Sequence, residues 1–165
     1  MADLDHKAQP TNIVSICSAD GWNSLVFEFK SRLSTRNGVF FVCSVSSDGK
    51  FCDREQTVTS EMMGELVPDY EFHLPQVILS EERLRECRDH LQKWLSNPFA
   101  FELQLSAPGE PTLTLFIGER DDFISKIDRP VFSLRYNSSR MKAESCFVID
   151  QSCVNLFLQG LNRWL

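Results

Sequence analysis

The sequence predicts an α+β fold in which an antiparallel, meander-like sheet is packed by two amphipathic helices, one central (residues 80–96) and one C-terminal (residues 150–165). Ser80 and Asp150 each precede a segment whose apolar residues recur with a helical period, as in helices that bury one face. Much of the remaining chain alternates apolar with polar residues between turn formers, which is typical of antiparallel strands. We therefore expect a single domain over residues 12–165, preceded by a flexible arm at residues 1–11.

The first half of the chain contains the strand signals that precede the central helix. The segment 39–45 is apolar on both faces, which indicates a central strand covered on each side, either by this chain or by a second copy. Asp48-Gly49 predicts a two-residue type I′ hairpin, because both residues tolerate positive φ. Another strand is expected to end at Pro75. The strands expected here are residues 12–17, 22–32, 39–45, 50–58 and 70–74.

The central helix has start and stop signals at both ends. The Ser80 hydroxyl can accept a hydrogen bond from a first-turn amide, and Leu79 and Leu84 have the spacing of a hydrophobic staple. Asn97-Pro98 ends the helix, because proline disfavours α geometry in the residue before it. The predicted buried stripe is Leu84, Cys87, Leu91, Trp94 and Leu95.

The second half predicts two hairpins and then the C-terminal helix. Strands 99–105 and 112–118 flank the turn-rich segment 107–111, and strands 131–136 and 141–148 flank residues 137–140. Asp150 is the expected cap of the last helix, and its predicted stripe is Phe157, Leu158, Leu161, Trp164 and Leu165. In total we expect about seven to nine strands in one sheet.

Composition limits the functional classes. The chain has 165 residues and a net charge of −6, which argues against nonspecific nucleic-acid binding and favours a protein partner with a basic surface. The first ten residues lack the order of a signal peptide, and no window reaches the length of a transmembrane helix, so we expect a cytoplasmic protein without membrane contact. The six scattered cysteines include no C-x-x-C pair and are expected to be reduced packing residues, with Cys43, Cys87 and Cys153 on predicted core faces.

No nucleotide-binding or hydrolase motif occurs, so the sequence predicts no enzyme and no cofactor. His6, His73 and His90 are dispersed; they predict no metal site and are expected to be solvated. A possible nucleophile is Cys52, beside Asp53, because Lys50 and Arg54 would lower its pKa, but no histidine is placed beside it.

A second candidate for chemistry is the strand face formed by Asp69, Glu71 and His73. Alternating acidic and imidazole side chains could bind a cation or move a proton, although the outward residues of any edge strand give the same pattern. An uncharacterised enzyme that uses Cys52 or this face therefore stays open as an alternative. So does a small-ligand-binding domain with an enclosed apolar pocket.

The segment Gly118–Phe123 places three carboxylates around one arginine and next to an aromatic residue. Acidic loops with an aromatic anchor suit the recognition of a basic protein surface. A solvated connection whose Phe123 folds back onto the core gives the same sequence pattern. We expect one acidic end of the sheet, and the candidate partner-binding residues are Glu110, Glu119, Asp121, Asp122, Phe123 and Asp128.

The second half resembles the small bacterial immunity proteins of the WapI type and their uncharacterised relatives. The resemblance rests on Leu-Ser-Glu-Glu-Arg-Leu at positions 79–84, Phe99 and Phe101, Gly-Glu-Pro-Thr-Leu-Thr-Leu at 109–115, and the terminal amphipathic helix. It covers about the last hundred residues and includes no site motif. It implies a cytoplasmic protein that neutralises a cognate toxin by binding it, without catalysis. The oligomeric state stays open.

Overall fold

The computed structural model describes residues 12–49, 70–120 and 129–165, which form two four-stranded antiparallel sheets and two helices. The first sheet has the order β1 (Ile13–Cys17), β2 (Ser24–Thr35), β3 (Gly38–Gly49) and β4 (Tyr70–Ser80). The second has the order β5 (Phe101–Gln104), β6 (Thr112–Arg120), β7 (Arg129–Asn137) and β8 (Lys142–Val148). The helices are α3 (Glu81–Ser96) and α4 (Gln151–Trp164). The α+β class with a central and a C-terminal helix is confirmed.

Both helices begin where the sequence predicts, directly after the fourth strand of a sheet. The Ser80 hydroxyl accepts a hydrogen bond from the Arg83 N–H at 3.3 Å, and the Asp150 carboxylate accepts one from the Cys153 N–H at 3.0 Å. Each cap satisfies an amide that the first helical turn leaves without an intrahelical partner. The chain therefore uses the same arrangement twice, a meander of four strands followed by a capped helix.

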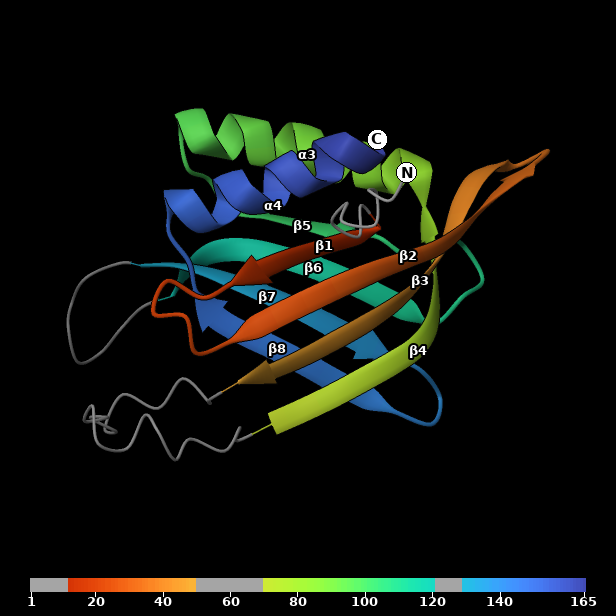
Figure 1. Cartoon of the computed structure of the whole chain (residues 1–165), viewed down its shortest axis with the longest axis horizontal. Coiled ribbons are helices and arrows are strands. Elements are labelled where there is room, and N and C mark those ends of the chain that lie inside the picture. The colour runs from red at the N-terminus through yellow and green to blue at the C-terminus, as the bar shows by residue number, and fades with distance from the viewer. Residues whose placement is uncertain (1–11, 50–69, 121–128) are drawn as a thin grey trace, which may run out of the picture.

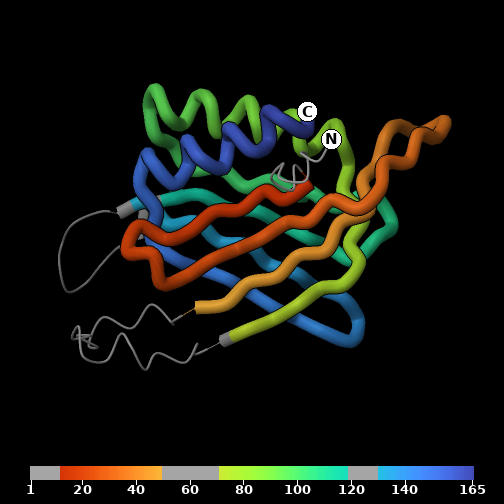
Figure 2. The backbone as a smooth tube through the Cα atoms, in the orientation of Figure 1, coloured from red at the N-terminus to blue at the C-terminus, as the bar shows by residue number. Residues whose placement is uncertain are grey.

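The two sheets face each other, and both helices lie along one side of the pair (Figures 1 and 2). The inward side chains of both sheets and the apolar stripes of both helices form one core. Helix α4 contacts β1 closely at Gly160, where a Cβ atom would lie 2.9 Å from Val14 Cγ1. No helix in the described ranges is long and apolar enough to span a membrane.

Backbone and side-chain hydrogen bonds join the sheets at several places. The Ser80 N–H donates to the Leu105 carbonyl and the Ala107 N–H to the Ile78 carbonyl, both at 2.9 Å. Ser47 Oγ on β3 and Ser145 Oγ on β8 are hydrogen-bonded at 2.9 Å, and both residues are buried. The two meanders therefore share polar contacts as well as an apolar core.

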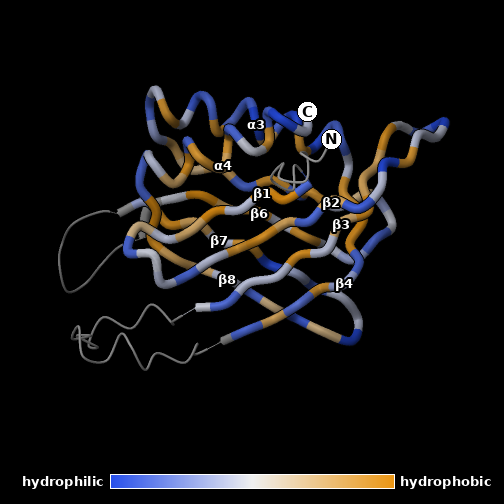
Figure 3. Tube along the Cα trace, viewed as in Figure 1, coloured by the Kyte–Doolittle hydropathy of each residue, from blue (hydrophilic) through white to orange (hydrophobic). Residues whose placement is uncertain are grey.

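The expectation of one sheet is wrong, because the chain divides its strands between two sheets of four. Alternation along strands such as β2 and β8 was correctly assigned to half-buried strands, and Figure 3 shows the hydropathy along the chain. Strand alternation reports which residues face a core but not which strands are neighbours. A core between two sheets and a core between one sheet and its helices therefore give the same sequence pattern.

The predicted hairpin at Asp48-Gly49 is also wrong. Both residues belong to β3, where Asp48 pairs with Ser24 of β2 and with Glu71 of β4. Gly49 does have a positive φ of 155°, but the reason is close packing: a Cβ atom there would lie 2.8 Å from the Asn23 Cα. The proposed return strand at residues 50–58 lies outside the described residues.

Strand β4 does not end at Pro75 but continues to Ser80. The register shifts at this point, so that Val45 pairs with Leu74 whereas Cys43 pairs with Val77. Pro75 therefore lies in a β-bulge on an edge strand, where a missing N–H costs no ladder hydrogen bond. The bulge changes the alternation, and Leu74, Val77 and Leu79 all reach the core.

Candidate functional site

The outer face of the first sheet, the face turned away from the core, carries the candidate site. Along β2 the residues Leu25, Phe27 and Phe29 are buried, so the alternate residues, such as Ser24 and Val26, point outward. The strand register extends this outer face to Ser46 and Asp48 on β3, and to Glu71 and His73 on β4.

These strands form an open groove of about 320 Å³. We call it the acidic groove, and the residues that line it are Ser24, Val26, Ser46, Ser47, Asp48, Glu71, Phe72 and His73. The carboxylate of Asp48 accepts a hydrogen bond from the Ser24 hydroxyl at 2.9 Å, which fixes its position. Asp48 and Glu71 are directly paired across β3 and β4, and Ser46 pairs with His73.

The acidic groove has the chemistry of a cation acceptor. Cross-strand partners on one face have Cβ atoms about 4.5–5.5 Å apart, so Asp48 and Glu71 hold two negative charges close together. Glu28 lies further along the same face of β2, outside the groove lining. In the part of the chain that the structure describes, no group of three His, Cys, Asp or Glu side chains is placed to hold a metal ion.

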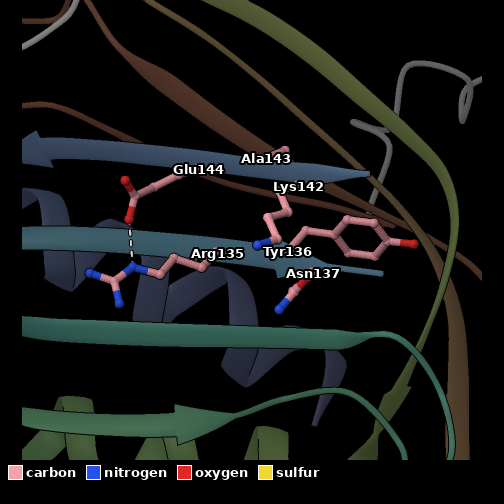
Figure 4. Close-up of a pocket in the computed structure, with 6 residues that line it drawn as sticks. All are labelled: Arg135, Tyr136, Asn137, Lys142, Ala143 and Glu144. Atoms are coloured by element: carbon pink, nitrogen blue, oxygen red, sulfur yellow. Dashed lines mark hydrogen bonds and ion pairs between the residues drawn. The ribbon is translucent and has the colours of Figure 1, made fainter. Parts of the chain in front are cut away.

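A second hollow of about 300 Å³ lies at the end of the β7–β8 hairpin (Figure 4). Its lining residues are Arg135, Tyr136, Asn137, Lys142, Ala143 and Glu144. Arg135 Nε donates a hydrogen bond to the Glu144 carboxylate, and this bond raises the pKa of the Arg135 guanidinium. The pair neutralises its own charge and leaves Lys142 as the one uncompensated charge among the described residues of this lining, whereas the acidic groove has two carboxylates.

The described core space between α3, α4 and β2 is filled. The space bounded by Phe27, Phe29, Leu84, Cys87, Leu105, Phe157 and Leu161 leaves no room for a water molecule. This part of the core cannot hold the enclosed ligand that the small-ligand alternative requires.

The described thiols differ in exposure. Burial raises the pKa of Cys43 and of Cys87 to about 12, and burial also raises the pKa of Cys153. These three side chains are therefore protonated and act as packing residues, as the sequence predicts. Cys146 is half-buried, Cys17 is exposed, and Cys52 lies outside the described residues.

The structure separates some residues that the sequence grouped together. Glu110 lies in the turn between β5 and β6, whereas Glu119 lies near the far end of β6, so the expectation that both belong to one acidic end of the sheet is wrong. Asp121, Asp122, Phe123 and Asp128 lie outside the described residues.

Two histidines have contrasting environments. His73 is exposed on the outer face of β4 beside Glu71, as expected, although Asp69 lies outside the described residues. His90 is not the solvated side chain that we expected: its ring centroid lies 5.0 Å from that of Phe101, and its Nδ1 atom lies 2.8 Å from the Glu86 carbonyl oxygen.

Sequence reasoning also missed Asp48 as a residue of the acidic groove. The dipeptide Asp48-Gly49 is typical of a turn, so Asp48 was not assigned to a strand.

Comparisons of the chain with protein-family models, with curated proteins and with solved structures found no match.

Proposed function

We propose that this chain is a non-catalytic cytoplasmic binding protein whose acidic groove binds a basic segment of a protein partner. The observation that carries the proposal is the direct pairing of Asp48 with Glu71 on an open, outward face. The resemblance to WapI-type immunity proteins supports a cognate bacterial toxin as the partner, neutralised by direct binding.

The pairing of two carboxylates favours a cationic partner. Like charges directly opposite each other on a sheet are destabilising, so an ammonium or guanidinium group between them removes a repulsion and also gains charge-assisted hydrogen bonds. Val26 and Phe72 add apolar surface to the same groove, which suits the aliphatic stem of a lysine or arginine side chain.

The shape of the groove favours a protein segment over a small metabolite. Sites for small molecules usually bury about 70–90% of the ligand surface. The acidic groove is an open depression on a sheet, which a side chain attached to a larger docked surface can fill. Opposite potentials on the two surfaces would speed encounter and restrict the choice of partner.

The first test asks whether a toxin-like protein is encoded next to this gene, and its absence would count against a toxin as the partner. Where such a protein is encoded, it is purified in an inactive form and complex formation is measured by isothermal titration calorimetry. The groove variant combines Asp48→Lys and Glu71→Lys, and the loop variant combines Asp121→Lys and Asp122→Lys. The control combines Glu82→Lys and Asp89→Lys, two exposed residues of α3, and has the same change in net charge.

We expect a one-to-one complex that the groove variant weakens by about tenfold or more, because it replaces attraction by repulsion, whereas the control weakens it much less. A complex weakened by the loop variant alone would assign binding to residues 121–122 and would reject the groove. Absence of any complex with the wild-type chain would reject the toxin-binding function itself.

A further inference from the structure

The hairpin between β2 and β3 extends beyond the body of the molecule as a twisted ribbon (Figure 1). We call residues 30–40 the β2–β3 arm. All residues from Lys30 to Gly38 are exposed, and the Leu33 side chain is 42% exposed. A long exposed ribbon with an apolar residue is a typical contact element, because its surface is not needed for the core of its own chain.

Charge is segregated along the first sheet. In the described part of this sheet, residues 13–49 and 70–80, the only lysine and arginine residues are Lys30, Arg32 and Arg36, and all three lie on the arm. Arg32 already pairs with Glu81 of α3 at 3.4 Å. Lys30 and Arg36 therefore supply the positive charge at the arm, while Asp48 and Glu71 supply the negative charge at the opposite end.

The arm and the acidic groove present groups on the same outer face. Leu33 pairs with Phe40, and Phe40 has the same outward phase on β3 as Ser46 and Asp48. Phe40 is only half-buried, so this face is apolar near the arm and acidic near the groove. Val26 and Leu33 are separated along β2 by seven residues, or about 23 Å of strand.

We infer that the outer face of the first sheet binds the same face of a second copy of this chain, with the β2–β3 arm of each copy in the acidic groove of the other. A two-fold axis that lies in the interface and crosses β2 at right angles brings both contacts together. In this arrangement Leu33 contacts Val26 of the other copy, while Arg36, at the tip of the arm, approaches Asp48 and Glu71. Charge complementarity and the half-covered apolar residues of β3 argue for this occupant.

The inference shares the groove with the proposed function but requires no partner protein. Each ion pair between exposed groups contributes only about 0.2–1 kcal/mol, so the dimer is expected to be weak and sensitive to salt. A basic segment of a partner would compete with the arm of the second copy for the acidic groove. The dimer is therefore expected to dissociate when the partner binds.

The test measures the mass of the full chain, without any partner, by sedimentation velocity over a range of protein and salt concentrations. We expect a concentration-dependent dimer whose dissociation constant rises by about tenfold from low to high salt, because screening removes the two arm–groove contacts. The arm variant is Arg36→Glu, and the groove variant combines Asp48→Lys and Glu71→Lys. Each variant alone is expected to be monomeric.

The decisive step mixes the two variants in equal amounts. The acidic arm tip of the first variant then meets the basic groove of the second, and the basic arm tip of the second meets the acidic groove of the first, so a mixed dimer is expected to form. The control variant with Glu82→Lys and Asp89→Lys is expected to dimerise like wild type. A wild-type chain that is monomeric at all concentrations, or a mixture that stays monomeric, would overturn the dimer. Neither result affects toxin binding, which is measured separately.

Discussion

Single side chains in this protein differ sharply in what they contribute to stability, and two leucines of α4 allow a direct comparison. Leu161 is 2% exposed in the core between α4 and the sheets, whereas Leu156, on the same helix, is 65% exposed. We expect Leu161→Ala to lower the free energy of unfolding by about 2–5 kcal/mol, because it removes buried methyl groups and leaves a cavity. Urea denaturation followed by circular dichroism would measure the loss.

The control for this change is Leu156→Ala, which removes the same atoms from solvent-exposed surface. Alanine has a slightly better helix propensity than leucine, so we expect a change within about 0.5 kcal/mol. Equal losses in the two variants would mean that the apolar stripe of α4 is assigned to the wrong face.

At the scale of the element, the N-cap of α4 is a discrete contribution to stability. The Asp150 carboxylate accepts hydrogen bonds from the Ser152 hydroxyl and the Cys153 N–H, and these bonds lower the pKa of Asp150 to about 2. We expect Asp150→Ala to cost about 1 kcal/mol at neutral pH, because the alanine side chain leaves the first-turn amide without a protein partner. Thermal or urea unfolding would detect the change.

The contribution of the Asp150 cap to stability is expected to fall at acidic pH. A lowered pKa in the folded state means that the unfolded state binds the proton more tightly, so the contribution of the ionised cap is present above about pH 4 and is lost as pH falls toward 2. Asp150→Asn keeps an acceptor oxygen without a titrating group, so we expect it to retain the cap at neutral pH and to lack the acid-dependent loss. A constant difference between wild type and Asp150→Asn from pH 2 to pH 7 would contradict this account.

The elements that sequence reasoning identified correctly are those specified by local interactions. A cap, a staple and a periodic stripe lie within one helix, and both helices were placed with their caps for this reason. The predicted turn at Asp48-Gly49 and the predicted strand end at Pro75 were wrong, because the conformation at both places depends on contacts with residues far away in the chain. Gly49 makes room for Asn23, and Pro75 lies in a bulge opposite β3, so neither residue ends its strand.

The candidate site has the same dependence on distant residues. Glu71 and His73 could be assigned to one strand face, because alternation alone determines it. The acidic groove also requires Asp48 and Ser24, which come from two other strands and meet only through the strand register. No local pattern encodes that register, so the groove could be found only once the sheet was known.

For the whole molecule, the central question is how two meanders with separate hydrogen-bond ladders form one body. The shared apolar core and the backbone bonds at the sheet edges give part of the answer, and the buried pair Ser47–Ser145 gives a polar link between β3 and β8. Ser47 Oγ also lies 2.8 Å from the Ser24 carbonyl oxygen. Because a hydroxyl has a single hydrogen, donation to that carbonyl leaves Ser47 Oγ to accept from Ser145.

A double-mutant cycle on this pair tests whether the Ser47–Ser145 contact couples the two sheets. Ser47→Ala and Ser145→Ala are each expected to cost about 1–3 kcal/mol, because each leaves a buried hydroxyl with one partner fewer. The double variant should be more stable than the sum of the two losses predicts, by about 0.5–1.5 kcal/mol, because the second change no longer breaks the shared bond. Urea titration gives the free energy of unfolding of the four proteins in the cycle, which are wild type, the two single variants and the double variant. Strictly additive losses would show that the serine pair does not couple the sheets, and two separate unfolding transitions would show that the sheets unfold independently.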